Sequence, residues 1–391
     1  MLRYLTAGES HGPALTAILE GMVSNLQIGS AEINADLARR QGGYGRGGRM
    51  LIEKDEVEIL AGIRHGKTLG SPIALVVHNK DWVNWQDVMA VEGFGTGKKV
   101  TRLRPGHADL PGVLKYDQDD LRNILERASA RETTMRVAVG AVCKKFLGEF
   151  GVRIFSHVVQ IGSVKAPSAV ELARAGRSNG KAYRALAESA EESVVRCGNS
   201  RVAKAMVTLI DEASEKKDSL GGVFEVVALN LPVGLGSHVH YDRKLDGRLA
   251  QALMSIQAMK GVEIGIGFEA AGRFGSKVHD EIFLKSKKIV RGGNNAGGLE
   301  GGMTNGEPLI VRVAQKPIST LRKPLRSIDI ATGKPSQAHF ERADICAVPA
   351  GGVIGEAVVA FELARAFLEK FGGDSLGETR RNYQGNRGQI S

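Results

Sequence analysis

Apolar residues recur along the chain with two spacings, and each spacing predicts one kind of element. Alternating or short continuous apolar runs bounded by glycine, proline and polar residues are typical of strands. Such runs occupy residues 2–7, 57–60, 72–77, 152–161, 223–231 and 309–313. Glycines and a proline at 8–13 predict a turn after the first strand, and glycines at 66–70 predict a turn between the second and third.

Other segments carry the three-to-four-residue spacing of amphipathic helices. We expect helices over 35–41 with Asn34 as N-cap, from Asp119 or Asp120 through Leu125, over 135–146, over 245–258 and over 356–371. The last of these has the clearest helical period. Residues 165–200 are polar and rich in alanine, which favours surface helix and loop.

The order of these elements bears on the fold class. Strands and helices mix without a regular strand–helix–strand repeat, and no proline- or serine-rich linker divides the chain. The pattern therefore predicts an α+β fold with one large domain over residues 1–372. Residues 373–391 are polar, and we expect them to form a mobile C-terminal tail.

The composition of the 391 residues is that of a packed globular protein, with 42% hydrophobic and 25% charged residues. The 50 glycines are nearly twice the usual share of about 7%, yet the apolar content excludes both collagen and disorder. Lys and Arg exceed Asp and Glu by 53 to 43, so the net charge is +10. This balance favours acidic partners without deciding among phosphate, carboxylate and nucleic acid.

The cysteines and the N-terminus bear on the compartment. Cys143, Cys197 and Cys346 are odd in number and form no C-x-x-C pair, which favours a reducing cytosol over secretion. The N-terminus lacks a signal-peptide apolar segment, and no stretch approaches the roughly 18 apolar residues needed to cross a bilayer. We therefore expect a soluble cytoplasmic protein. We also expect no metal site, since His238 and His240 have no third ligand nearby.

Three glycine motifs match the sequence patterns of known binding or catalytic sites but lack neighbouring elements or residues that those sites require. Residues 43–48 match G-x-G-x-x-G, but the dinucleotide fingerprint needs a preceding strand, and here a helix precedes. Residues 93–99 resemble a P-loop, but Lys99 stands where Ser or Thr should bind magnesium. Residues 8–12 match the G-x-S-x-G of α/β-hydrolases. Only one predicted strand precedes Ser10, and no segment offers a candidate general base for this serine. A serine hydrolase is therefore kept as the alternative function and not as the first choice.

A concentration of arginines predicts an anion site. Arg39, Arg40, Arg46 and Arg49 lie within eleven residues and are interleaved with five glycines. Guanidinium groups bind phosphate and carboxylate bidentately, and a glycine-lined loop adds backbone N–H donors. An RGG-type RNA-binding tract is the other interpretation, but two isolated copies of that pattern are too few.

Further basic residues cluster at 102–107, at 127–131, at 322–326 and at Arg342. His11 and His107 lie among them in turns framed by glycine and proline. A histidine beside arginines is well placed to donate a proton to an anionic leaving group. A second glycine-rich loop, 292–302, offers backbone against which a flat ligand can lie.

Three further motifs occur in this order: residues 8–12 (GESHG), residues 126–136 (ERASARETTMR) and residues 342–349 (RADICAVP). Together they closely resemble the signatures of the chorismate synthase family. Residues 40–49, 104–109, 218–222, 260–265 and 316–320 also match in the family's order, so the likeness spans nearly the whole chain. Ala343 and Ile345 replace commoner residues beside Asp344, and Val23 stands where proline is usual, but no reactive group is lost.

The resemblance implies a single-domain β-α-β sandwich, usually a homotetramer. It implies a carbon–oxygen lyase of the shikimate pathway that converts 5-enolpyruvylshikimate 3-phosphate to chorismate by trans-1,4-elimination of phosphate. The family requires reduced FMN without net redox change, and NADPH is the candidate reductant of that flavin. A separate flavin reductase is the favoured partner, because the chain shows no added reductase domain, and neither nucleic acid nor a membrane is expected.

The resemblance also assigns residues. By the family's pattern, substrate is met by Ser10, Arg40, Arg46, Arg49, Arg104, Arg131 and Arg342. The flavin contacts fall on Arg127, Ala128, Ser129, Gln257, Ala258, Gly301, Lys316, Pro317, Ile318, Ser319, Thr320 and Arg342. Three residues are implied to be catalytic. His11 lies near the leaving phosphate, His107 balances the charge of the reduced flavin with a proton, and Asp344 handles the proton at flavin N5.

Overall fold

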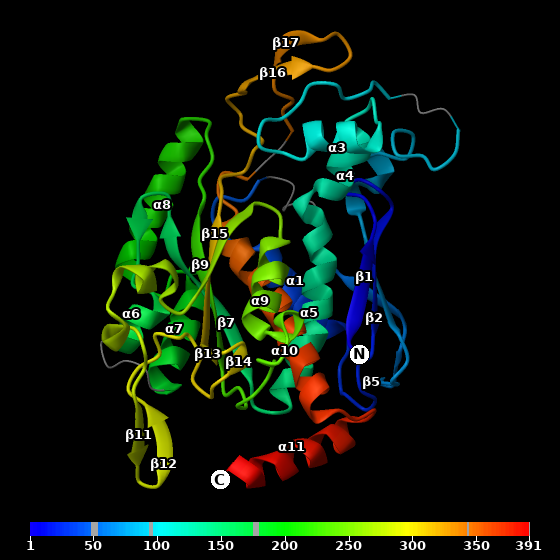
Figure 1. Ribbon diagram of the computed structural model, residues 1–391. Coiled ribbons are helices and arrows are strands. Elements are labelled where there is room, and N and C mark those ends of the chain that lie inside the picture. The colour runs from blue at the N-terminus through cyan, green and yellow to red at the C-terminus, as the bar shows by residue number, and fades with distance from the viewer. Residues whose placement is uncertain (48–53, 94–96, 175–179, 342–343, 391) are drawn as a thin grey trace.

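The computed structural model describes residues 1–47, 54–93, 97–174, 180–341 and 344–390. Two antiparallel sheets form its framework (Figure 1). The four-stranded sheet has the order β1-β2-β6-β3 and contains β1 (Arg3–Ala7), β2 (Ala14–Glu20), β3 (Val57–Ala61) and β6 (Ile73–His78). The five-stranded sheet has the order β10-β15-β9-β7-β8 and contains β7 (Arg153–Ile161), β8 (Val164–Lys165), β9 (Gly222–Leu229), β10 (Met259–Ile264) and β15 (Leu309–Gln315).

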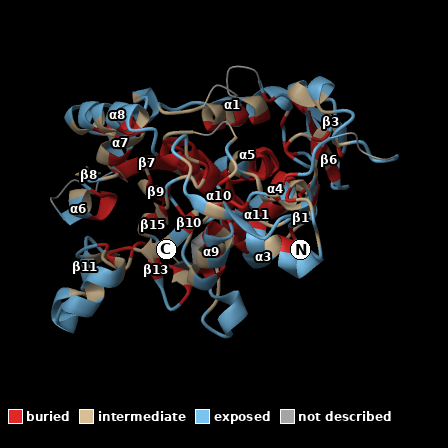
Figure 2. Cartoon of the chain, turned by 90° about the horizontal axis from the view of Figure 1, so that it is seen from above, coloured by how far each residue is buried: buried red, intermediate tan, exposed pale blue. Residues whose placement is uncertain are grey.

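Helices fill the space between the two sheets (Figure 1). They are α5 (Thr133–Gly148) and α10 (Val348–Phe371), flanked by α1 (Ser30–Gln41) and α9 (Leu245–Met254). Helix α10 is buried along most of its length, as Figure 2 shows, because it is apolar on nearly every side. The two central helices approach so closely that a Cβ at Gly140 would overlap Ala357, so this crossing requires glycine.

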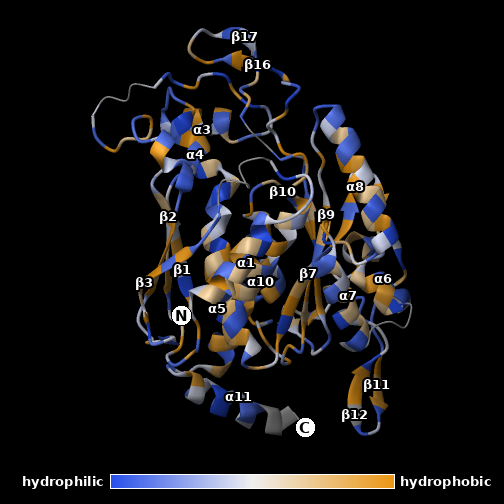
Figure 3. Ribbon diagram, turned by 180° about the vertical axis from the view of Figure 1, so that it is seen from behind, coloured by the Kyte–Doolittle hydropathy of each residue, from blue (hydrophilic) through white to orange (hydrophobic). Residues whose placement is uncertain are grey.

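Within the described part of the chain, a helical layer covers the outer face of the five-stranded sheet alone. Helices α6 (Ala169–Arg174), α7 (Gly180–Glu192) and α8 (Ser200–Glu215) lie outside the five-stranded sheet. Tyr183 of α7 packs there in a cluster that includes Phe155 and Val227. On the four-stranded sheet, the outward Leu5 and Ile18 are exposed. The apolar colour of Figure 3 accordingly concentrates in the central helices and in the strands. The architecture is a β-α-β sandwich, which confirms the predicted α+β class.

The remaining elements are short and surround the sandwich. Two-stranded hairpins are formed by β4 (Ile63–Arg64) with β5 (Lys67–Thr68), β11 (Ile282–Lys285) with β12 (Lys288–Arg291), β13 (Leu299–Glu300) with β14 (Met303–Thr304) and β16 (Arg326–Asp329) with β17 (Lys334–Gln337). Two further helices, α3 (Asp109–Tyr116) and α4 (Arg122–Ala128), precede α5. Among the described residues, no helix has the length and apolarity required to cross a membrane.

Two helices begin earlier than the sequence predicts. Helix α1 starts at Ser30 with Gly29 as its N-cap, so the predicted N-cap Asn34 is wrong. Asn34 lies inside the helix, where its side-chain oxygen accepts a hydrogen bond from the Val57 N–H at 2.8 Å. Helix α10 starts at Val348, eight residues before the predicted start, because the glycines of its first turns conceal the apolar period. Strand β2 is not among the predicted strands.

The C-terminal segment is helical. The sequence predicts a mobile tail over 373–391, whereas the structure forms helix α11 (Leu376–Ile390) there. Its Tyr383 packs against Phe150, Phe367 and Phe371 with ring centroids 5.2–5.5 Å apart. Leu376, the first residue of the helix, is also buried in the core. Such apolar positions are too few in this otherwise polar segment to show a helical period. The division of the chain into domain and tail at residue 372 stays a prediction.

Candidate active site

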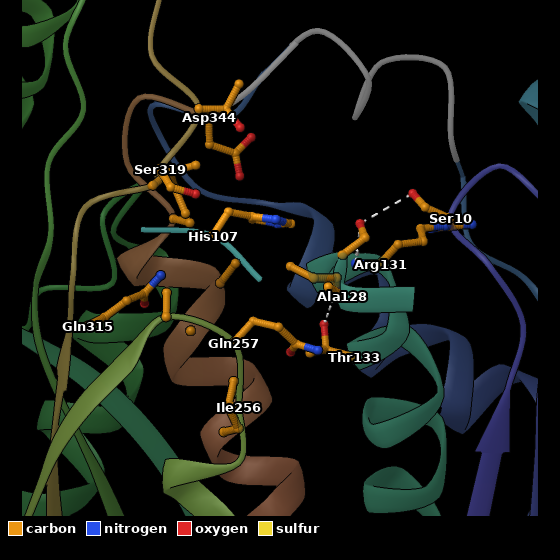
Figure 4. Close-up of a pocket in the computed structure, with 18 of the residues that line it drawn as sticks. Ser10, His107, Ala128, Arg131, Thr133, Ile256, Gln257, Gln315, Ser319 and Asp344 are labelled. Atoms are coloured by element: carbon orange, nitrogen blue, oxygen red, sulfur yellow. Dashed lines mark hydrogen bonds between the residues drawn. The ribbon is translucent and has the colours of Figure 1, made fainter. Parts of the chain in front are cut away.

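A cavity of about 410 Å³ lies at the N-terminal ends of the two central helices. Its walls come from the β1–β2 turn, the end of α1, the loop before α3, the α4–α5 junction, residues 256–259, residues 315–320 and the start of α10. Figure 4 shows Asp344, His107 and Ser319 on one side of the cavity and Ser10 and Arg131 on the other. Helix N-termini carry partial positive charge and unpaired N–H groups, so this position suits an anionic ligand.

Basic side chains dominate the charge of the cavity wall. They are Arg40, Arg46, Arg104, Arg131 and Lys316. The side chains of Arg40, Arg104 and Arg131 are only 3–5% exposed, so bulk water screens their charges weakly. Among the described residues that line the cavity, the acidic ones are Glu341 and Asp344. The excess of positive charge suits a ligand with more than one acidic group.

A buried carboxylate organises two of the arginines. Asp55 accepts a hydrogen bond from Arg131 at 2.5 Å and pairs with Arg40 at 3.3 Å. Asn79 holds the other edge of Arg131, accepting from Nε at 3.0 Å and from Nη2 at 2.9 Å. Burial lowers the pKa of Arg40 to about 9, with Asp55 acting in the opposite direction, so the guanidinium stays charged at neutral pH. Asp55 therefore fixes two cations in one wall.

Asp109 plays the same part for a third arginine and a histidine. Its side chain is fully buried and accepts from Arg104 Nε at 2.9 Å and Nη2 at 3.1 Å. Nδ1 of His107 lies 2.5 Å from the Asp109 carboxylate. Burial raises the pKa of Asp109, but the contacts with His107 and Arg104 outweigh it and hold the pKa well below its usual range. The carboxylate thus orients both cavity-lining groups.

The glycine-rich loop after α1 is attached to the start of α10. Asp344 accepts a hydrogen bond from the Gly47 N–H at 2.7 Å and pairs with Arg46 at 3.2 Å. The carbonyl of Gly45 accepts from the N–H groups of Ile345 and Cys346 at 2.8 and 3.2 Å. Gly45 has φ +87°, a conformation that favours glycine. Segments 300 residues apart therefore present Arg46 and Asp344 together.

The β1–β2 turn presents Ser10 and His11. Ser129 Oγ donates a hydrogen bond to Ser10 Oγ at 3.3 Å, the contact drawn at the right of Figure 4. Nδ1 of His11 lies 2.9 Å from Glu126, and the His11 ring stacks on Trp85 with centroids 4.0 Å apart. Both histidines of the cavity therefore have a carboxylate at Nδ1.

The opposite end of the cavity offers acceptors and an apolar surface. The side-chain oxygens of Gln257 and Gln315 are buried and have no hydrogen-bond partner among the described residues. Ile256, Ala350 and Ile354 line the same region. A flat ring with N–H donors can satisfy the two oxygens while its faces contact the apolar side chains.

The structure brings most of the predicted site residues to this cavity. Those that line it are Ser10, His11, Arg40, Arg46, Arg104, His107, Ala128, Ser129, Arg131, Gln257, Ala258, Lys316, Ile318, Ser319, Thr320 and Asp344. Arg127, Gly301 and Pro317 are not among the lining residues. Arg127 donates instead to the backbone carbonyls of Thr6 and Gly8, and Gly301 lies in the β13–β14 turn. Arg49 and Arg342 lie outside the described residues.

Sequence reasoning missed the carboxylates and the amide that hold these side chains. They are Asp55, Asn79, Asp109, Glu126 and Glu341. Asp109 and Glu126 lie inside motifs that were recognised. Asp109 follows His107 by two residues and Glu126 directly precedes Arg127, so these positions could have identified them. Asp55 and Asn79 lie in no motif, and only the fold brings them to Arg131.

Two of the alternative motif interpretations fail on structural context. A hydrolase nucleophile elbow joins a strand to a helix. The turn that holds Ser10 joins strand β1 to strand β2. The dinucleotide fingerprint requires a strand before its glycines, whereas Gly43 follows helix α1. Both segments instead present side chains to the basic cavity, namely Ser10, His11 and Arg46.

Comparison with known proteins agrees with this fold and site. The chorismate synthase family model matches residues 2–368. The chain is 56% identical over 396 residues to the chorismate synthase of Geobacter sulfurreducens, covering 98% of each chain. It is 58% identical over 386 residues to that of Aquifex aeolicus, covering 98% of this chain and 96% of the relative. A solved crystal structure of chorismate synthase is 49% identical, with a TM-score of 0.81, over 100% of this chain and 98% of that one.

The fold and the site define an α+β sandwich protein with a basic, histidine-containing cavity at the ends of its central helices. The chain belongs to the chorismate synthase family, because the family model and the relatives both cover nearly its whole length.

Proposed function

We propose that this protein converts 5-enolpyruvylshikimate 3-phosphate to chorismate by trans-1,4-elimination of phosphate, as a carbon–oxygen lyase of the shikimate pathway. The ring C–O bond to phosphate breaks, a ring C–H bond breaks, and a second ring double bond forms. The substrate carries two carboxylates and a phosphate. The observation that carries the proposal is the cavity in which four arginines, a lysine and two histidines converge at two helix N-termini.

The buried arginines bind and orient the substrate. Arg40 and Arg131 are held in one wall by Asp55, and Arg104 is held by Asp109, so little side-chain entropy is lost when an anion binds. Each charge-assisted contact is worth about 1.5–3 kcal/mol. Several fixed contacts keep the scissile bond in one orientation and exclude water from the anions.

Ser10 and His11 act on the departing phosphate. A histidine that holds a proton near the bridging oxygen assists cleavage by neutralising the charge that develops there. Ser10 positions the phosphate by hydrogen bonding and forms no covalent bond. We expect Ser10→Ala to reduce turnover without abolishing it, whereas complete loss together with a trappable acyl-serine in the wild type would favour the hydrolase alternative.

The residues at the other end of the cavity fit reduced FMN. The unpartnered oxygens of Gln257 and Gln315 suit ring N–H groups, and Lys316 suits an anionic group of the cofactor. When bound, reduced FMN supplies an electron to the substrate and takes one back. With the cofactor bound, His107 would hold a proton that balances the charge of the reduced ring, and Asp344 would handle the proton at ring N5.

The proposal extends to the state of the protein and its supply of electrons. We expect a homotetramer in the cytoplasm, with flavin reduced by a separate reductase or by NADPH. Light scattering measures the mass of the assembly, and NADPH oxidation by the purified protein with FMN measures any reductase activity of its own.

Anaerobic incubation with 5-enolpyruvylshikimate 3-phosphate and chemically reduced FMN tests the proposed function. We expect chorismate to accumulate, seen by its absorbance and by mass. Hydrolysis of simple esters without flavin would instead support the serine hydrolase, and salt-sensitive RNA binding without flavin uptake would support the RNA-binding interpretation.

A further inference from the structure

Glu126 lies behind the cavity and contacts none of the space that a ligand would occupy. It belongs to helix α4, and its side chain is 1% exposed. It is not among the described residues that line the cavity, whereas His11 is. Any effect of Glu126 on a ligand must therefore pass through another residue.

Glu126 holds the turn of His11 at three points. Its carboxylate lies 2.9 and 3.0 Å from Nδ1 of the His11 ring and accepts from the His11 backbone N–H at 2.8 Å. Its backbone carbonyl accepts from the Ser10 N–H at 3.1 Å. Both the ring and the backbone of His11 are thereby fixed relative to α4.

Two neighbouring side chains keep this arrangement in place. Arg122 donates to the Glu126 carboxylate at 2.8 Å, and its guanidinium lies 4.8 Å from the centre of the Trp85 ring. The His11 ring lies against the same Trp85 with an interplanar angle of 30°. The carboxylate is thus neutralised by Arg122, and the imidazole is restrained at one edge and one face.

We propose that Glu126 is a positioning residue that keeps His11 in the tautomer protonated at Nδ1. A carboxylate paired with arginine accepts hydrogen bonds and does not donate them, so the Nδ1 atom that faces it must carry the proton. In both charge states of the ring, the proton exchanged with a ligand is then the one on Nε2. Without such a carboxylate, the wrong tautomer is accessible and catalysis by a histidine falls steeply.

This inference rests on the proposed function for its chemical consequence. The imidazolium gives its Nε2 proton to an oxygen of the departing phosphate and becomes the neutral Nδ1–H imidazole, without rearranging its contact with Glu126. Solvent returns the Nε2 proton after the phosphate leaves. Charge and protons balance, because the phosphate carries away the proton that the ring loses.

Nitrogen NMR of the histidine rings in the ligand-free protein tests the inference directly. Protonated and unprotonated ring nitrogens differ widely in ¹⁵N chemical shift, and the His11→Asn variant assigns the His11 signals by their loss. We expect the neutral His11 ring to be protonated at Nδ1 in the wild type. In Glu126→Gln, whose amide can either donate or accept, we expect a mixture of tautomers and a kcat at least about a hundredfold lower, with KM within a few-fold.

Glu58→Gln is the matched control. Glu58 contacts Nε2 of His78 at 3.0 Å on the exposed edge of the four-stranded sheet, with side chains 57% and 68% exposed. This variant should leave the His11 signals and kcat unchanged. Glu126→Asp keeps the charge and should restore the Nδ1–H tautomer in part, and with it part of kcat.

A neutral His11 protonated at Nε2 in the wild-type protein would overturn the inference, and this measurement needs no variant of Glu126. An unchanged tautomer with wild-type kcat in Glu126→Gln would overturn it equally. Failure of the proposed function has a different signature. The wild type would then release no phosphate, while the tautomer of His11 would still show whether Glu126 fixes the ring.

Discussion

Asp344 and Arg46 form an ion pair at 3.2 Å inside the cavity, joining the start of α10 to the loop that follows α1. The side chains are 21% and 13% exposed, so this is not the solvated surface pair that is worth about 0–1 kcal/mol. Oδ1 of the same carboxylate accepts from the Gly47 N–H at 2.7 Å. Asp344 therefore combines a structural contact with a position beside the ligand.

Replacing Asp344 by asparagine separates these two roles. The amide keeps the size and can still accept from the Gly47 N–H, but it cannot take up a proton. We expect affinities for substrate and reduced FMN to stay within a few-fold while turnover falls at least about a hundredfold. Asp242→Asn is the control, since Asp242 also pairs with a neighbour but is 63% exposed. Wild-type turnover of Asp344→Asn across the pH range would make Asp344 structural.

Arg46→Ala tests whether the glycine-rich loop binds the substrate. Loss of one charge-assisted contact costs about 1.5–3 kcal/mol, so we expect substrate affinity to fall by about ten- to 150-fold, much more than flavin affinity. Arg3→Ala removes an arginine that pairs with Glu20 on the exposed β1 strand and should change neither affinity. Equilibrium titration with each ligand measures the substrate affinity and the flavin affinity. An unchanged substrate affinity in Arg46→Ala would show that Arg46 does not bind the substrate.

His107 lies beside Asp109 and lines the cavity, which distinguishes it from a histidine of the apolar core. We expect His107→Ala to lower turnover by about 10²- to 10⁴-fold, the usual contribution of one positioned acid or base. The variant should remain folded, because Arg104 still pairs with the buried Asp109 carboxylate. Turnover and melting temperature measured on the same preparation decide the matter: a loss of activity in proportion to a loss of stability would indicate a structural histidine.

The sequence could predict the elements that follow a regular period and the residues that lie in recognised motifs. Strand 152–161 and helix 135–146 agree with β7 and α5 to within two residues at each end. Arg40, Arg104 and Arg131 were recognised because each lies in a short segment that matches a motif of the family. Such features need no knowledge of distant contacts.

Other features depend on the tertiary fold. Asp55 meets Arg131 across 76 residues, and Asp344 meets Gly47 across 297 residues, so no local pattern relates them. The early start of α10 escaped prediction because Gly351, Gly352 and Gly355 serve close packing against the five-stranded sheet and interrupt the apolar period.

A second charge cluster, away from the cavity, controls stability in acid. Glu356 of α10 is fully buried and contacts Arg39, Lys144 and Arg196. Burial raises the pKa of Glu356, but the three cations outweigh burial and hold the pKa well below its usual value. The unfolded chain therefore binds a proton at this group at a higher pH than the native protein does, and stability falls as the pH drops.

Glu356→Gln should remove this contribution and leave the three cations with Asp36 and Glu191, both more exposed than Glu356, as their anions. We expect the free energy of unfolding to fall by about 3–5 kcal/mol at neutral pH. The difference in unfolding free energy between wild type and variant should be constant from about pH 6 to 8. It should shrink below about pH 4.5, where the unfolded wild-type chain takes up a proton at Glu356. Denaturant unfolding across this range measures it, and a difference that grows in acid would contradict the sign.

The most direct test of the account is the release of phosphate from 5-enolpyruvylshikimate 3-phosphate under anaerobic conditions, measured together with chorismate. With chemically reduced FMN we expect one phosphate for each chorismate, over many turnovers for each flavin, because the proposed reaction has no net redox change. With oxidised FMN alone, or without flavin, we expect no release. Sustained release of phosphate with oxidised FMN alone, or consumption of one reduced flavin for each product, would contradict the account.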